Sequence, residues 1–333
     1  MMRGVCIAIA AWAVMMTARA SGEPYLSPLA IALRGEFLCV ADATANRVVV
    51  VNAKKGRVVR AFSTNGAPSG IAASPDGKRL YVTAGVADGR VLVLSARTGK
   101  IVAEFDTGHS PNSPVVSPDG KTLFVCNQFT NDVSVFDVEA RKEIGRVPVT
   151  REPVAAAIAP DGKWLLVANL LPKGSANSGY VAASVDVVDT NARSVRASII
   201  LPNGSTDLHG ICVSPDGAYA YVTHILSRYQ LPTTQLERGW VNTNAVSVIE
   251  IGAMALVNTV LLDNVDMGAA NPWGVTCSPD GRWLLVAHAG SHEISIIDRN
   301  RLHQKLAEAA ARGGAKTVPN DLAFLVGLRE RCR

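Results

Sequence analysis

The chain has 333 residues, a net charge of +5 and a hydrophobic content of 48%, while aromatic residues make up only 5%. This length is enough to bury the core of one large repeat domain or of two ordinary domains. The positive charge is mild and forms no runs, and aromatic rings are too few for a base-stacking surface. Nucleic acid is therefore not an expected partner.

The first 20 residues have the pattern of a secretory signal peptide. Arg3 provides the basic start, residues 5–16 are apolar, and Ala18-Arg19-Ala20 is a small-x-small cleavage site. The apolar stretch is too short to span a bilayer comfortably, and no later segment does so. We therefore expect a periplasmic or secreted protein that begins near Ser21 and has no membrane span.

A turn motif recurs along the rest of the chain. Ser-Pro-Asp-Gly stands at residues 74–77, 117–120, 214–217 and 278–281, and Ala-Pro-Asp-Gly stands at 159–162. Each copy is followed at once by a short apolar run such as LYVT or LLVA. A turn followed by a strand, repeated about every 42 residues, has the period of a blade in a β-propeller.

The second unit shows how one blade is built. The small residues 70–73 form a first strand, the turn motif closes a hairpin, and residues 79–83, 91–94 and 101–105 follow as three more strands. Four antiparallel strands make one blade. Small residues suit the first strand, because the innermost strands of all blades crowd around the central axis.

The sequence therefore predicts an all-β fold, a β-propeller with six recognisable four-stranded blades in residues 21–300. Insertions follow the second strands of the fourth and fifth units, at 173–180 and 226–243. Residues 301–333 predict an Ala-rich helical segment and then the start of a further, incomplete blade.

Ring closure is open between two alternatives. Either six blades close the ring, or a seven-bladed type is truncated and leaves strand edges exposed at a gap. In the second case we expect dimerisation or instability.

The runs LYVTA, LFVCN, LLVAN, AYVTH and LLVAH resemble the YVTN family of β-propeller repeats over residues 29–298. The stretch that begins YVTHILSRYQ and the tail VPNDLAFLVGL are similar to regions of such propellers that continue into further blades. In some of those relatives a di-haem, cytochrome c peroxidase-like domain follows. The resemblance therefore implies a truncated or split version of such a protein as one alternative.

The cysteines do not point to a cofactor on this chain. Haem attachment through CxxCH is excluded, because no such motif is present. The cysteines after the signal peptide are scattered and odd in number, which argues against a disulfide framework. Two of them, Cys39 and Cys126, lie inside apolar strand runs and are expected to act as small buried hydrophobes.

Propeller topology assigns each loop to one of two faces. The turn motifs lie on one face, and the loops that leave second strands or enter first strands lie on the other, the channel-mouth face. Five of the six histidines and both insertions map to the channel-mouth face. A concave channel mouth with convergent polar groups predicts a site for a protein partner or a small ligand. The candidate residues are His209, His224, Arg228, Tyr229, Arg238, Trp240, Asn242, Trp273, His288 and His292.

A structural role competes with binding for these residues. His224 and His288 fill the repeat position that Asn127 and Asn169 fill in other blades, where the side chain is expected to hydrogen-bond neighbouring backbone. A metal ion held by His209, His224 and His288 is a further hypothesis, since these residues come from two neighbouring blades. The only support for this hypothesis is an analogy with another β-propeller whose histidines hold a metal cluster at the mouth.

No nucleophile elbow, Walker A loop, HExxH or Rossmann glycine pattern occurs in the sequence. The leading hypothesis is an exported, non-catalytic binding module that uses the channel-mouth face and the 226–243 insertion. A second hypothesis is the propeller component of a split di-haem peroxidase-like protein, with a haem-bearing redox partner. A metal-binding propeller and a lactonase-like enzyme are the remaining alternatives.

Overall fold

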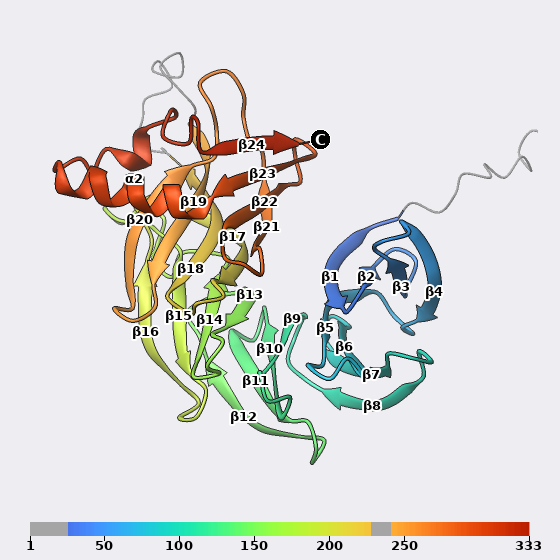
Figure 1. The fold of residues 1–333 in the computed structure, drawn as a ribbon. Coiled ribbons are helices and arrows are strands. Elements are labelled where there is room, and N and C mark those ends of the chain that lie inside the picture. Colours follow the sequence, from blue (N-terminus) through green and yellow to red (C-terminus); the bar gives the residue numbers. More distant parts are fainter. Residues whose placement is uncertain (1–25, 228–240, 333) are drawn as a thin grey trace, which may run out of the picture.

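The computed structural model describes residues 26–227 and 241–332, and its strands form six four-stranded antiparallel sheets (Figure 1). Each sheet is one blade, and in every blade the strands follow the order of the chain from the innermost to the outermost. The six-bladed, all-β architecture that the repeat predicts is therefore confirmed.

The first three blades occupy the N-terminal half of the chain. Blade 1 contains β1 (Pro28–Arg34), β2 (Phe37–Asp42), β3 (Arg47–Asn52) and β4 (Arg57–Ser63). Blade 2 contains β5 (Pro68–Ala73), β6 (Arg79–Ala84), β7 (Arg90–Ser95) and β8 (Ile101–Asp106). Blade 3 contains β9 (Pro111–Val116), β10 (Thr122–Asn127), β11 (Asp132–Asp137) and β12 (Lys142–Pro148).

The other three blades complete the series. Blade 4 contains β13 (Pro153–Ile158), β14 (Trp164–Asn169), β15 (Ser184–Asp189) and β16 (Ser194–Ile200). Blade 5 contains β17 (Ser205–Val213), β18 (Tyr219–Ser227), β19 (Asn242–Glu250) and β20 (Ala255–Leu261). Blade 6 contains β21 (Pro272–Cys277), β22 (Trp283–His288), β23 (Glu293–Asp298) and β24 (Arg329–Cys332).

The turn motif closes the first hairpin of each blade from 2 to 6. In blade 2 the Gly77 N–H donates to the Ser74 carbonyl over 2.8 Å, and Gly77 has a φ of +66°. The Ser74 hydroxyl donates to the Asp76 carboxylate over 2.6 Å, which lowers the pKa of that carboxyl group. The polar residues of the motif are thus occupied by the turn itself.

The tail has a different place from the one that the sequence suggested. The expected helix is present as α2 (Arg299–Ala311), which begins after the capping side chain of Asp298, and a 3₁₀ turn, η2 (Val318–Asn320), follows it. The segment expected to open a further blade instead forms β24, which pairs with β23 (Figure 1). The helix is therefore an insertion between the third and fourth strands of blade 6, and the tail completes that blade.

Successive blades pack together through apolar sheet faces. Helix α2 extends the last of these interfaces, since Leu302 and Leu306 pack into the cluster between blades 5 and 6 together with Val260 and Val286. Innermost strands contact one another from β1 through β5, β9, β13 and β17 to β21. Among the described strands β21 and β1 share no comparable contact, so the six blades form an open arc (Figure 1).

Candidate functional site

The channel mouth is built where the innermost strands begin. In blades 5 and 6 a residue with positive φ lies close to the start of the innermost strand: Asp207 (φ +59°) is the third residue of β17, and Asn271 (φ +52°) directly precedes β21. The pairing with the second strand shifts register immediately afterwards. His209 lies two residues after Asp207, and Trp273 lies two residues after Asn271. The same local backbone geometry therefore presents both rings at the mouth.

His209 and Trp273 meet across the boundary between blades 5 and 6. Their rings stack in parallel, with centroids 3.7 Å apart and an interplanar angle of 13°. The Asp207 carboxylate lies 3.1 Å from His209 Nε2. Burial lowers the pKa of His209, and the Asp207 charge opposes that effect. Trp273 keeps 43% of its surface exposed, so the stack is an aromatic platform with one open side.

His224 and His288 lie inside their blades. Each side chain is buried, and each imidazole forms a hydrogen bond at Nδ1 and another at Nε2. His224 bonds the Ile225 carbonyl through Nδ1 (3.1 Å) and the Ser247 hydroxyl through Nε2 (2.8 Å). His288 bonds the Ala269 carbonyl (3.1 Å) and the Ser295 hydroxyl (2.8 Å) in the same way. Because a carbonyl only accepts, each Nδ1 carries the proton and each Nε2 accepts from the serine.

The other blades show what these two histidines do. Asn127 donates to Ser134 on the third strand of blade 3, and Asn169 donates to Asp186 in blade 4. His224 and His288 reach the third strand from the same repeat position. Their structural role, a bond from the second strand to the third, is thus visible in the geometry. Burial lowers the pKa of both imidazoles to about 4, so both are neutral at pH 7.

The proposed metal ligands do not converge in the structure. Among residues 26–227 and 241–332, no three His, Cys, Asp or Glu side chains are grouped so that they could hold one metal ion. His209 has Asp207 beside it, whereas the nitrogens of His224 and His288 are already occupied. His292 lies exposed on the turn between β22 and β23 with a φ of +54°.

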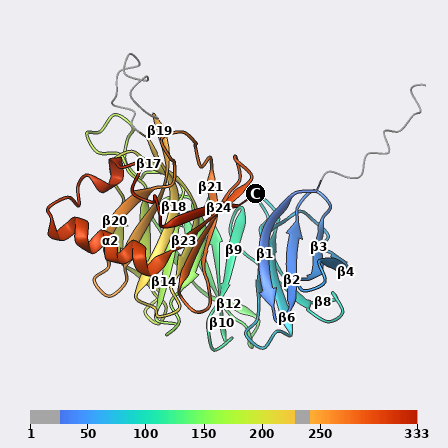
Figure 2. The ribbon, with the colours of Figure 1, turned by 45° about the horizontal axis from the view of Figure 1, so that its top comes forward.

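Blade 5 extends beyond its neighbours at the mouth. Its first three strands have nine residues each, whereas the corresponding strands of blade 4 have six. Three additional residues lengthen a strand by roughly 10 Å. The exposed Asn242 begins β19 at this projecting edge (Figure 2). The predicted residues Arg228, Tyr229, Arg238 and Trp240 lie outside the described residues.

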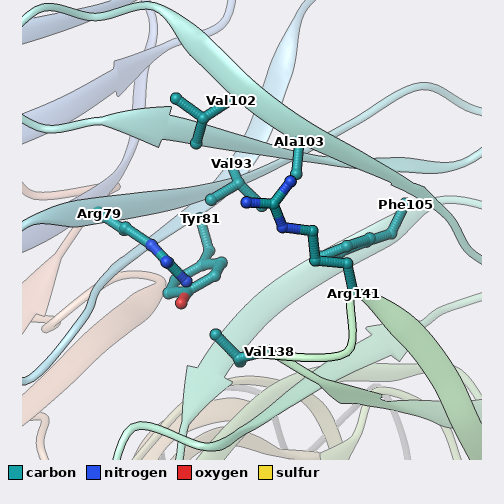
Figure 3. Close-up of a pocket in the computed structure, with 8 residues that line it drawn as sticks. All are labelled: Arg79, Tyr81, Val93, Val102, Ala103, Phe105, Val138 and Arg141. Atoms are coloured by element: carbon teal, nitrogen blue, oxygen red, sulfur yellow. The ribbon is translucent and has the colours of Figure 1, made fainter.

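A small pocket lies between blades 2 and 3, and no sequence motif predicted it. Its empty volume of about 210 Å³ includes open solvent at its mouth. Arg79 lies beside the Tyr81 ring, and Arg141 extends over the apolar floor (Figure 3). Two arginines were visible in the sequence, but only packing of the two blades brings them to one opening.

None of the described helices is both long enough and apolar enough to cross a bilayer.

Fold and site together define an open, six-bladed β-propeller with an aromatic channel mouth and one projecting blade. No family model matches the chain, so the resemblance to the YVTN family stays a prediction. A solved chain of hydrazine synthase from Kuenenia stuttgartiensis is similar to this protein, with a TM-score of 0.84 and 25% sequence identity. The match covers 95% of this chain and 89% of the solved chain.

A curated relative shows similarity at the level of sequence. The hydrazine synthase subunit beta of Kuenenia stuttgartiensis is 33% identical over 125 residues, which are 37% of this chain and 32% of the relative. The aligned segment thus spans about a third of that protein's length. In fold and in part of its sequence, the chain is related to a hydrazine synthase subunit.

Proposed function

We propose that this protein is a non-catalytic propeller subunit that docks a protein partner of an enzyme assembly through its channel-mouth face. The observation that carries the proposal is the projecting edge of blade 5 beside the His209–Trp273 stack. An exposed aromatic ring next to a raised edge offers both an anchor and a specific shape to a partner surface.

The relatives support this reading. The similar proteins are named as hydrazine synthase and its subunit beta, so they belong to an enzyme with more than one kind of chain. We infer that this chain plays a comparable part, with the chemistry carried by its partners. A haem-bearing redox chain is the partner that the sequence resemblance suggests, and export to the periplasm is the compartment we propose.

The histidine geometry also favours docking over catalysis. Buried, neutral His224 and His288 have no free nitrogen for a substrate or an ion. Asp207 and His209 form an ion pair at the mouth when His209 is protonated, and one face of the imidazole stacks on Trp273. We assign this pair to positioning of the Trp273 ring.

A matched pair of substitutions in blade 5 tests the docking face. Asn242→Lys adds charge and bulk at the projecting edge, whereas Ala218→Lys adds the same charge at the opposite end of the blade. Ala218 is exposed, and Lys78, Lys121 and Lys163 stand at its position in other blades. We expect the tagged wild-type chain and Ala218→Lys to co-purify from the native host with a stoichiometric partner, and Asn242→Lys to lose it.

Two results would overturn the proposal. One is an Asn242→Lys chain that retains its partner as fully as Ala218→Lys does. The other is turnover of a lactone or of peroxide by the purified chain alone, which would make it an enzyme. Elemental analysis of the same sample tests the metal hypothesis separately.

A further inference from the structure

The first residue of the second strand occupies an equivalent position in all six blades. In each blade it pairs with the last residue of the third strand. The rings at this position in blades 1, 4 and 5 pack into the apolar cluster that the blade shares with the next blade. Blade 2 has Arg79 there instead of a ring. The four blades with an aromatic residue carry Phe37, Trp164, Tyr219 and Trp283.

The pocket between blades 2 and 3 lies at the boundary that lacks such a ring. Its floor includes Tyr81, Phe105 and Val138, which are 1%, 6% and 7% exposed. All three belong to the apolar cluster that these two blades share. Arg79 lies two residues after the glycine of a turn motif, so the pocket is at the turn-motif end of the blades, opposite the channel mouth.

The second arginine of the pocket, Arg141, differs from its counterpart in the next blade. Arg141 and Arg193 each follow a third strand by four residues, and their φ values are +55° and +52°. Arg193 reaches back to blade 3 and donates to the Ile144 carbonyl over 2.8 Å. Arg141 reaches back to blade 2 over Val102, yet its guanidinium forms no hydrogen bond with the part of the chain that the structure describes (Figure 3).

The pocket carries positive charge without a protein counter-charge. The ion pairs within residues 26–227 and 241–332 involve neither Arg79 nor Arg141. Burial raises the pKa of Tyr81, and a hydrogen bond from Arg79 opposes that shift. The phenol therefore keeps its proton at pH 7 and can donate it in a hydrogen bond. Guanidinium groups bind carboxylates through charge-assisted hydrogen bonds.

We propose that this pocket binds a small organic monocarboxylate. Its apolar body takes the place of the ring that blade 2 lacks, and its carboxylate lies between Arg79 and Arg141. An inorganic anion would leave the apolar floor uncovered, and a neutral apolar molecule would leave the two charges unpaired. The ligand binds without covalent change, on the face opposite the channel mouth, so this site and the proposed docking face are independent.

Butyrate is the probe that tests the proposal. We expect saturation-transfer NMR with the purified full chain to show butyrate binding with a dissociation constant of about 1 mM. Butyramide has the same shape but no charge, and it should bind roughly tenfold more weakly. Acetate keeps the charge but lacks two methylene groups, and it should also bind roughly tenfold more weakly.

Three conservative substitutions test the two arginines against a matched control. Arg79→Gln and Arg141→Gln each remove one charge at the pocket and should weaken butyrate binding by about tenfold. Arg193→Gln removes the equivalent charge in blade 4, where the guanidinium already bonds a carbonyl, and should leave butyrate binding unchanged. The melting temperature of each variant shows whether the fold is retained.

Arg79→Trp restores the ring that blades 4 and 6 carry at this position. The indole should fill the pocket, so butyrate binding should be lost while the melting temperature stays the same or rises. Loss of binding in a chain that is at least as stable as the wild type cannot come from unfolding. Asn242→Lys should bind butyrate as the wild type does, which keeps this test separate from the channel-mouth proposal.

Several outcomes would overturn the inference. They are a wild-type chain that does not bind butyrate, equal binding of butyrate and butyramide, equal binding of butyrate and acetate, a loss of binding in Arg193→Gln as large as in Arg141→Gln, and full binding in Arg79→Trp.

Discussion

Two histidines show how one residue type can be structural at a position that looks functional. His224 and His288 end second strands at the channel mouth, yet each is buried and bonded to a serine of the third strand. An imidazole with both nitrogens occupied links strands in the way that Asn127 does in blade 3. Such a histidine makes the stability of the fold depend on pH.

The stability of the protein should fall as the pH is lowered through 6.5. The folded state holds the pKa of His224 and His288 at about 4, whereas unfolding restores the ordinary value near 6.5. The unfolded chain therefore binds more protons between these values, and acid favours unfolding. Each histidine should lower the free energy of unfolding by about 2 kcal/mol at pH 5 relative to pH 7.5. Urea denaturation at the two pH values measures this difference.

The Asn of the other blades supplies the matched variant. In His224→Asn/His288→Asn the difference in unfolding free energy between pH 7.5 and pH 5 should shrink by about half or more. The exposed His292→Asn is the control and should keep the wild-type difference. An unchanged pH dependence in the double variant would contradict the assignment of both residues as buried, neutral bases.

At the scale of elements, the innermost strands of blades 5 and 6 bring two thiols together. Cys212 on β17 and Cys277 on β21 lie with their sulfur atoms 4.0 Å apart. The hydrogen bond from Cys212 lowers the pKa of Cys277, and the Arg299 guanidinium lowers it further. Cys126 is fully buried, and burial raises its pKa to about 12. Cys277 is thus the more nucleophilic of these thiols near neutral pH.

Oxidised glutathione should join Cys212 to Cys277. The Cys277 thiolate attacks the glutathione disulfide and releases one glutathione; the Cys212 thiolate then attacks the mixed disulfide and releases the second. Mass spectrometry should show a loss of about 2 Da in the peptides that hold this pair. The cross-link closes a long loop and should add roughly 2–4 kcal/mol of stability. In Cys277→Ser neither change should occur, and a wild-type chain that stays reduced would contradict the prediction.

Elements that depend on long-range contacts could not be predicted from the sequence, whereas locally determined hairpins could. The repeated turn predicts the strands of blades 2 to 5 well, because Pro and Gly fix a hairpin locally. The fourth strand of blade 6 lies behind a helix, so only tertiary pairing of Arg329–Cys332 with β23 reveals it. The His209–Trp273 stack likewise joins residues 64 positions apart, and the equal repeat position of the two was its only signal in the sequence.

At the scale of the whole molecule, the arc of blades has two apolar ends. The sequence repeat could show that six units exist, but not whether they close, because closure depends on the curvature that all blades build together. The structure leaves Ile31 and Leu33 exposed on blade 1 and Ile294 exposed on blade 6. The expectation that an open ring dimerises or is unstable therefore stays a prediction, and its physical cause can be tested directly.

The purified chain should bind a dye that reports exposed apolar surface, such as anilinonaphthalene sulfonate. Ile31→Lys/Leu33→Lys places two charges on the uncovered face of blade 1, so dye fluorescence should fall markedly. Both side chains already face solvent in the free chain, and the free energy of unfolding should change by less than about 1 kcal/mol. Val86→Lys adds charge at an equally exposed valine away from the gap and should leave the dye signal unchanged. Equal fluorescence in all three proteins would mean that the ends of the arc are covered in solution, because a charged, open face cannot retain the dye.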